Sequence, residues 1–434
     1  MSGFLSWFVS VIDPRQLTAM LAVLPDLVGS FNLYIWLLVV YPLVRFQLPV
    51  LTIWALDVLY PGFWAPPVQK REFRRWPLVS VVIPGRNESD TIEHTIRSVL
   101  NCGYPNVEII FIDDFSTDDT IVKARRFEHT GRVRTFAASA HHGKPSSLNI
   151  GIAMSRGRYI FVLDADSEVQ YGAIQEMVEH FNDPTVGAVA ANIRVRNART
   201  NYLTRLQECE YALNLSMARL WRARLNLLGI VPGAAGMFRA SILRSQGGYD
   251  TGLGEDTDMT LRLRKQKWRL NFALNAVVWS NVPVRWRALF RQRQRWERNM
   301  VKIRLRKQRD LVMPWRYGWT NTIFAIDMFM VRLVFPLMSF GGIIYINLTT
   351  PFSMALVLTH IYWITAIFTC LKLCISWDLC FTPRAASLWY GPAVPIYRAA
   401  LRFAIFIAFA LELLRIGQRH GYVPDPIWQE TPHW

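Results

Sequence analysis

Cysteines and acidic residues are both scarce in this chain of 434 residues. None of its five cysteines belongs to a CxxC pair. A disulfide framework and a paired-cysteine zinc site are therefore not expected, and this usage is compatible with a domain in the cytosol. Acidic residues number 32 against 49 lysines and arginines, which gives a net charge of +17.

The surplus of positive charge is concentrated in one window, residues 285–316. Twelve lysines and arginines stand there against two acids, Glu297 and Asp310. Such a block can bind nucleic acid, anionic lipid or a phosphate-bearing substrate. Because apolar segments follow the block directly, we interpret residues 302–309 as a stripe on a cytosolic membrane surface, and nucleic acid is not an expected partner.

Long apolar runs flank a more polar centre. Residues 27–43 with their flanks approach the length of a bilayer span, and the shorter run 48–60 could complete a hairpin or lie in the interface. Three further runs, 323–348, 352–375 and 392–414, can each cross a membrane. The number of crossings and the orientation of the termini stay open.

A basic link before residue 77 places the central domain on the cytosolic side of a plasma (inner) membrane. Asp327 and Arg332 lie inside an apolar run and must pair, snorkel or line a cavity. The predicted division has four parts: an N-terminal membrane or interfacial segment 1–76, a central domain 77–284, a basic interface segment 285–320 and C-terminal membrane helices 321–434.

The central domain alternates strands and helices. Short apolar, β-branched runs at 78–83, 107–112 and 159–163 predict buried strands, and 91–100 and 118–127 predict helices. This alternation is typical of an α/β domain with a mainly parallel sheet covered on both faces. Ligands of such sheets bind at the carboxyl ends of the strands, where acidic residues occur in this chain.

Four polar motifs follow one another along the chain: Asp113-Asp114, Asp164-Ala165-Asp166, Glu255-Asp256 and Gln292-Arg293-Gln294-Arg295-Trp296. Paired carboxylates suit a divalent cation that neutralises a diphosphate, and a carboxylate in a partly dry pocket suits a general base. Arginine offers a fork to phosphate, and tryptophan offers a flat face to a sugar ring. Together these groups meet the needs of sugar transfer from a nucleotide diphosphate.

Each motif also has a structural alternative. Asp113-Asp114 could cap a helix, and Asp164 with Asp166 could be ordinary turn acids. Asp258 is interpreted as a favourable charge at the start of the helix 257–265. The pair His141-His142 is interpreted as a loop rather than a metal site.

The order of these motifs resembles that of the membrane-bound family 2 glycosyltransferases, the group of cellulose, chitin, hyaluronan and poly-N-acetylglucosamine synthases. The resemblance covers about residues 77–300. It implies a GT-A fold, a helical membrane region, Mg²⁺ or Mn²⁺ as cofactor, and inversion at the anomeric carbon.

The resemblance also implies site residues. Asp256 matches the catalytic base with Glu255 beside it, and Asp164 and Asp166 match the ligands of the metal and the diphosphate. The nucleotide-sugar positions are Pro84, Arg86, Asn87, Glu88, Asp113, Asp114, Lys144, Asp164 and Asp166, with Asp114 reading the base. The acceptor and pyrophosphate positions are Gln292, Arg295 and Trp296, and the small-residue stretch 233–236 falls near the acceptor. The family more often has glycine where this chain has Phe115.

Three functional hypotheses remain at this point. The first is a processive synthase that makes a β-linked polysaccharide from UDP-N-acetylglucosamine or UDP-glucose and moves it outward. The second is a membrane enzyme that adds one sugar to a lipid acceptor with the same acids and metal. The third, a non-enzymatic basic protein, leaves the ordered acids unexplained. The expected partners are a nucleotide-sugar donor, a glycan or lipid acceptor and membrane lipids, with an accessory subunit as a further candidate.

Overall fold

The computed structural model describes residues 76–414 apart from 251, 253, 381–388 and most of 339–350, together with five positions between 51 and 59. The run 27–43 and most of the run 48–60, both predicted as membrane or interfacial segments, lie outside the described residues.

One sheet of eight strands organises the central domain, in the order β3-β2-β1-β4-β7-β6-β8-β5. Strands β1, β2, β3 and β4 pair in parallel, and so do β6 and β8. Strand β7 runs antiparallel to both of its neighbours, and β5 is antiparallel to β8. The strands are β1 Val79–Gly85, β2 Val107–Asp113, β3 Val133–Ala137, β4 Tyr159–Leu163, β5 Glu168–Val169, β6 Val186–Val195, β7 Ala235–Arg239 and β8 Arg269–Ser280. The parallel sheet is therefore confirmed for its first half, while the insertion of β7 makes the whole sheet mixed.

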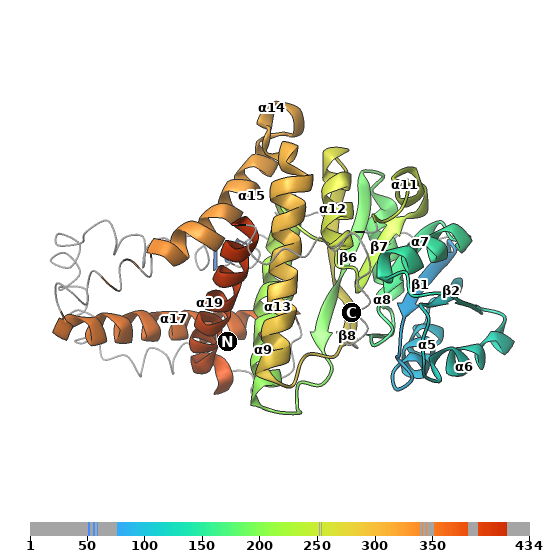
Figure 1. Cartoon of the computed structure of the whole chain (residues 1–434), viewed down its shortest axis with the longest axis horizontal. Coiled ribbons are helices and arrows are strands. Elements are labelled where there is room, and N and C mark those ends of the chain that lie inside the picture. Colours follow the sequence, from blue (N-terminus) through green and yellow to red (C-terminus); the bar gives the residue numbers. More distant parts are fainter. Residues whose placement is uncertain are drawn as a thin grey trace.

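Helices cover both faces of this sheet because its central strands are apolar on both sides. In β1 every residue is buried: Val81 and Ile83 join a core with α5 and α8, and Val82 joins the opposite core with α7 and α12. In Figure 1, α5 and α6 lie on one side of β1 and β2, and α7 lies on the other. The covering helices are α5 Ile92–Leu100, α6 Thr120–Arg125, α7 Lys144–Met154, α8 Ala173–Glu179, α11 Ala240–Ser245 and α12 Glu255–Lys265, with short 3-10 turns η3 Glu128–Thr130 and η4 His180–Asn182.

A second group of helices adjoins the part of the sheet that contains β6 and β8. It consists of α9 Tyr202–Tyr211, η5 Ala212–Met217, α10 Ala218–Arg224, α13 Trp286–Val301, η6 Lys302–Lys307, η7 Arg309–Val312, α14 Pro314–Tyr317, α15 Trp319–Phe329, η8 Met330–Val334, α17 Pro351–Cys380, η9 Gly391–Ala393 and α19 Val394–Leu413. Figure 1 shows α9, α13 and α19 running side by side, while α17 extends away from the sheet.

Glu210 joins three of these helices. Its carboxylate on α9 accepts hydrogen bonds from Arg293 of α13 at 2.9 Å and from the Tyr397 hydroxyl of α19 at 2.6 Å. An apolar cluster that includes Leu206, Leu289 and residues of α17 and α19 surrounds this contact. The central domain and the C-terminal helices therefore share a packed, hydrogen-bonded junction.

Two described helical stretches, Trp319–Met338 and Gly391–Glu412, are long and apolar enough to cross a membrane by length and composition. They coincide with two of the three predicted C-terminal spans. The remaining prediction coincides with α17, in which Ile361–Ser376 forms a shorter apolar stretch.

Several cations of the predicted membrane-surface stripe have partners inside the chain. Arg304 donates to the Gly229 carbonyl at 2.9 Å, and Arg306 pairs with Glu412 of α19 at 2.9 Å. Lys307 pairs with the buried Asp258 of α12. Part of the basic charge thus fastens η6 to its neighbours.

Arg332 is paired, as one of the sequence-based alternatives requires. Its guanidinium lies 2.7 Å from the carboxylate of Glu297 on α13, whose side chain is only 3% exposed. Burial raises the pKa of Glu297, and the charge of Arg332 counteracts that shift. This ion pair ties the first C-terminal apolar helix to the basic helix α13.

We expect Glu297→Gln and Arg332→Met each to lower thermal stability, by roughly 1–3 kcal/mol, because each leaves one member of a largely buried pair without its partner. The double variant should lose less than the sum of the two single losses. Melting of the detergent-solubilised chain measures this coupling, with Arg309→Met, at an exposed position, as the control. Additive single losses would show that the two side chains do not interact.

Candidate active site

The loops that follow β1 and β2 are joined to each other at the carboxyl edge of the sheet. The Asn87 backbone amide donates to the Ser116 hydroxyl at 2.9 Å, and the Thr117 amide donates to the Asn87 side-chain oxygen at 2.9 Å. The Glu88 amide donates to the Thr120 hydroxyl at 2.8 Å. These bonds hold the predicted nucleotide segment from Pro84 to Glu88 against the Asp113-Asp114 turn.

Asp114 anchors the loop that leads into α7. Its fully buried carboxylate accepts the backbone amides of His142 and Gly143 at 2.9 and 3.0 Å, and His141 Nδ1 lies 2.7 Å away. Asp113 is held by the amide and hydroxyl of Ser116. His141 therefore belongs to a loop, as interpreted from the sequence, and the reading of a base by Asp114 stays a prediction.

Phe115 occupies the left-handed backbone region with φ = 63°. This conformation is costly for residues other than glycine. It explains why the resembling family more often has glycine here, and shows that the turn is kept in this chain despite the substitution.

Lys144, the first residue of α7, is the central cation of the site. Its ammonium contacts the Asp164 carboxylate directly, just beyond the end of β4. Burial lowers the pKa of Lys144, but the charges of Asp164, Glu255 and Asp256 outweigh that effect and leave the pKa raised. Lys144 therefore remains protonated and acts as the counter-ion of the acids.

Asp164 and Asp166 flank the buried Ala165 in a tight turn, in which the Ser167 amide donates to the Asp164 carbonyl at 3.1 Å. Burial, and then the charge of Asp164, raises the pKa of Asp166 to about 6. Two crowded carboxyl groups of this kind favour a divalent cation. Among the described residues no group of three or more His, Cys, Asp or Glu is placed to hold a metal, and the metal role of Asp164 and Asp166 stays a prediction.

Glu255 and Asp256 open helix α12. Asp256 accepts the Thr257 amide at 2.6 Å, and its other carboxylate oxygen lies 3.5 Å from the Gly233 amide. Burial, followed by the charge of Asp256, raises the pKa of Glu255 to about 7. A Cβ at Gly233 would lie 3.4 Å from a Glu255 oxygen and 3.7 Å from Lys144 Nζ, so this stretch borders the acids, and its place near the acceptor stays a prediction.

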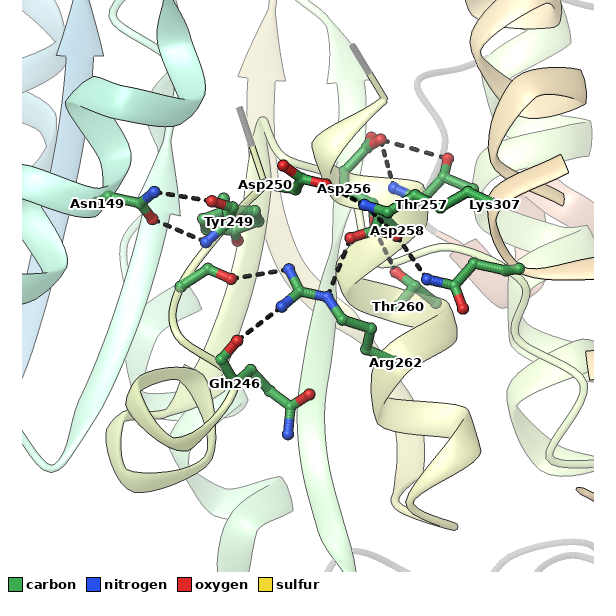
Figure 2. A network of polar contacts seen from close by, with 12 residues as sticks. Asn149, Gln246, Tyr249, Asp250, Asp256, Thr257, Asp258, Thr260, Arg262 and Lys307 are labelled. Atoms are coloured by element: carbon green, nitrogen blue, oxygen red, sulfur yellow. Dashed lines mark hydrogen bonds and ion pairs between the residues drawn. The ribbon is translucent and has the colours of Figure 1, made fainter. Parts of the chain in front are cut away.

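Figure 2 shows how α12 is fixed from both sides. Asp258 accepts Gln308 at 2.7 Å and pairs with Lys307 at 2.9 Å and Arg262 at 3.0 Å. Arg262 also donates to the Gln246 and Gly248 carbonyls, each at 2.8 Å. Asp258 is therefore an ion-pair partner in a buried network, beyond the helix-start charge interpreted from the sequence.

The Gln-x-x-Arg-Trp motif lies on α13. Burial lowers the pKa of Arg295, and the charges of Glu255 and Asp164 counteract that shift, which places its guanidinium within electrostatic reach of the acids. Trp296 is 42% exposed, and the Arg293 guanidinium lies 4.4 Å from the centre of its ring. Gln292 has a buried side-chain oxygen with no hydrogen bond among the described residues.

The sequence motifs did not reveal Arg293, Glu210 or Tyr397. Arg293 stands inside the Gln-x-x-Arg-Trp motif, but its partner Glu210 is 83 positions away, and Tyr397 lies on a C-terminal helix. No local pattern signals a contact among three such distant segments.

Comparisons with known proteins identify the family of this chain. The model of Glycosyl transferase family 2 matches residues 80–247. The chain is 31% identical over 319 residues to the "Probable glycosyltransferase YdaM" of Bacillus subtilis (strain 168), covering 70% of this chain and 74% of that one. It is 30% identical over 239 residues to a poly-beta-1,6-N-acetyl-D-glucosamine synthase of Staphylococcus epidermidis, covering 55% of this chain and 58% of the synthase.

Among solved structures, a mannosyltransferase from Pyrobaculum calidifontis, in complex with GDP-Man and Mn²⁺, matches with a TM-score of 0.55 and 21% identity over 86% of this chain and 97% of that chain. The fold is thus that of a GT-A-like glycosyltransferase, as the resemblance implied. The chain belongs to glycosyltransferase family 2. The match to the Staphylococcus synthase spans little more than half of that protein's length.

The raised carboxyl pKa values predict a pH-dependent stability. In the folded state the pKa of Asp166 is about 6 and that of Glu255 is about 7, whereas their ordinary values are 3.8 and 4.5. These two carboxyl groups therefore bind more protons in the folded chain than in the unfolded chain, and their contribution to stability falls as the pH rises from about 5 to about 8.

We expect Glu255→Gln to remove part of this fall, so that its stability relative to the unsubstituted chain grows with pH by on the order of 1–2 kcal/mol. Thermal melts across that range, without added metal or nucleotide, measure the difference. Asp183→Asn is the control, because the pKa of Asp183 is lowered and lies outside the window. If the stability of Glu255→Gln changed with pH in the same way as that of the unsubstituted chain, the raised pKa of Glu255 would not be the cause of the fall.

Proposed function

We propose that the protein is a membrane-bound inverting glycosyltransferase that polymerises β-linked N-acetylglucosamine from UDP-N-acetylglucosamine on the cytosolic face of a membrane. The observation that carries this proposal is the convergence of Lys144, Asp164, Glu255, Asp256 and Arg295. The names of the poly-β-1,6-N-acetylglucosamine synthases favour this donor over UDP-glucose.

The donor's nucleotide would lie along the loops after β1 and β2. Arg86 has a buried Nε atom without a hydrogen bond among the described residues, which leaves it available to the nucleotide. Lys144 and Arg295 supply positive charge for the diphosphate. Asp164 and Asp166 would hold Mg²⁺ or Mn²⁺, which would neutralise the leaving diphosphate; the Pyrobaculum enzyme was solved with Mn²⁺ and GDP-Man.

Asp256 is the general base of this proposal. One of its oxygens accepts the Thr257 amide at 2.6 Å, and the other, whose contact with the Gly233 amide is long at 3.5 Å, would take the proton of the acceptor hydroxyl. The acceptor oxygen then bonds to the anomeric carbon, the bond from that carbon to the diphosphate breaks, and UDP departs with the electron pair. A single displacement inverts the configuration, so an α-linked donor gives a β-linked product.

Trp296 offers an exposed ring to the acceptor's terminal sugar, and Arg293 stacked behind it restricts the orientation of that ring. The membrane location rests on the helices Trp319–Met338 and Gly391–Glu412 and on the basic segment beside them. Membrane lipids would then surround these helices.

We expect Asp256→Asn to lower UDP release from UDP-N-acetylglucosamine by at least about 100-fold, because the amide cannot accept the acceptor's proton, while donor binding persists. The assay uses the purified full chain with UDP-N-acetylglucosamine, UDP-glucose or GDP-mannose, and Asp183→Asn as the control. Turnover retained by Asp256→Asn would reject this residue as the base. A product of high mass supports a polymerase, whereas a singly glycosylated lipid would establish the alternative of single transfer.

Asp166→Asn should raise the Mn²⁺ concentration needed for half-maximal activity by at least about tenfold, because it removes one of two carboxylate ligands. Calorimetric titration of Mn²⁺ in the presence of UDP tests binding independently of turnover. Chelation should abolish activity, and readdition of the metal should restore it. Unchanged Mn²⁺ binding in the variant would place the metal elsewhere.

A further inference from the structure

A row of buried polar residues follows one face of α17. Thr369, Lys372 and Ser376 are spaced three and four positions apart, which brings them to the same side of a helix, and they are 3%, 5% and 0% exposed. Their neighbour Leu373 packs with Tyr397 and Leu401 of α19. The row therefore lies where α17 meets α19.

Lys372 is a buried cation without a partner. The Lys372 side chain is 5% exposed and has no hydrogen bond or ion pair among the described residues, and the Ser376 hydroxyl one turn away is buried and unbonded. The charges that act on Lys372 are those of Arg398 and Arg402 on α19, and both are positive. Burying an unpaired charge beside like charges is costly and calls for an anion.

The neighbouring acid does not supply that anion. Glu210 is near Arg398 but already accepts hydrogen bonds from Arg293 and Tyr397. Arg398 donates to the Asn214 side chain at 3.2 Å, and its Nε atom is buried without a partner. Lys372, Arg398 and Arg402 therefore lie near one another. Some of their N–H groups have no hydrogen-bond acceptor among the described residues.

Helices α17 and α19 also carry exposed apolar side chains. Ile367 on α17 is 52% exposed, and Ile396 and Phe403 on α19 are 63% and 53% exposed. Ile375 on α17 packs against Met217 and its neighbours beside the catalytic domain, so the cluster lies at the domain end of α17. Cationic side chains on two helices that also expose apolar side chains fit a ligand with an anionic head and acyl chains.

We propose that Lys372, Arg398, Arg402 and the Ser376 hydroxyl bind the phosphate group of an anionic membrane lipid between α17 and α19. The ammonium and guanidinium groups donate to the phosphate oxygens, and the exposed apolar residues contact the acyl chains. This site depends on the membrane location proposed above, and it is independent of the sugar donor and the catalytic acids.

Native mass spectrometry of the detergent-purified full chain tests the proposal with dioleoyl phosphatidylglycerol and dioleoyl phosphatidylcholine. The chain should bind phosphatidylglycerol at least about tenfold more tightly, and Lys372→Met should remove most of that preference. Lys372→Met should fold, because it replaces an unpaired buried cation by an apolar chain of similar length. Arg132→Met, which removes an exposed cation of the catalytic domain, is the matched control.

Equal affinity for the two lipids, or an unchanged preference in Lys372→Met, would overturn the proposal. Lys372→Arg keeps the charge and should keep the preference. If millimolar inorganic phosphate displaces the lipid in a Lys372-dependent way, the site belongs to a soluble phosphate and the lipid assignment is wrong. Lipid preference in a chain that releases no UDP would refute the proposed function while supporting this site.

Discussion

Mutual repulsion among carboxylates is the constraint on which the active site depends. Asp164, Asp166, Glu255 and Asp256 come from two distant segments and meet where burial weakens screening by water. Lys144 and Arg295 lie among them and offset part of the repulsion. The remaining repulsion is opposed by hydrogen bonds and ion pairs outside the acids themselves. The network around Asp258 and Arg262 holds α12 in place, and Asp114 holds the loop that presents Lys144.

The strands and their acidic ends were predictable because the signals are local. A buried β-branched run such as Val79–Gly85 and a carboxylate directly after a strand can be recognised within a few residues. The resemblance to a known order of motifs then supplied roles for Asp164, Asp256 and Arg295. The structure brings these positions together, although only ligands and substitutions test their roles.

Features that depend on distant pairing were not predictable in the same way. Strand β7 inserts antiparallel between its neighbours because of the direction in which the chain returns after α9 and α10. The composition of the chain does not predict that direction. Residues 302–309 were interpreted as a surface stripe from their charge and from the apolar segments that follow, yet Arg306 and Lys307 have acidic partners more than 45 positions away. The contact of Arg293 with Glu210 and Tyr397 likewise arises only in three dimensions.

Helix α13 serves two purposes with neighbouring residues. Arg295 and Trp296 are proposed to act in the chemistry of the site, whereas Arg293 and Glu297 hold the helix against α9, α19 and η8. Under the proposed function, loss of either kind of residue would lower the activity measured in cells. A genetic screen for inactive variants would thus recover both kinds as one phenotypic class, and only protein abundance in the membrane fraction would separate misassembled variants from intact but inert ones.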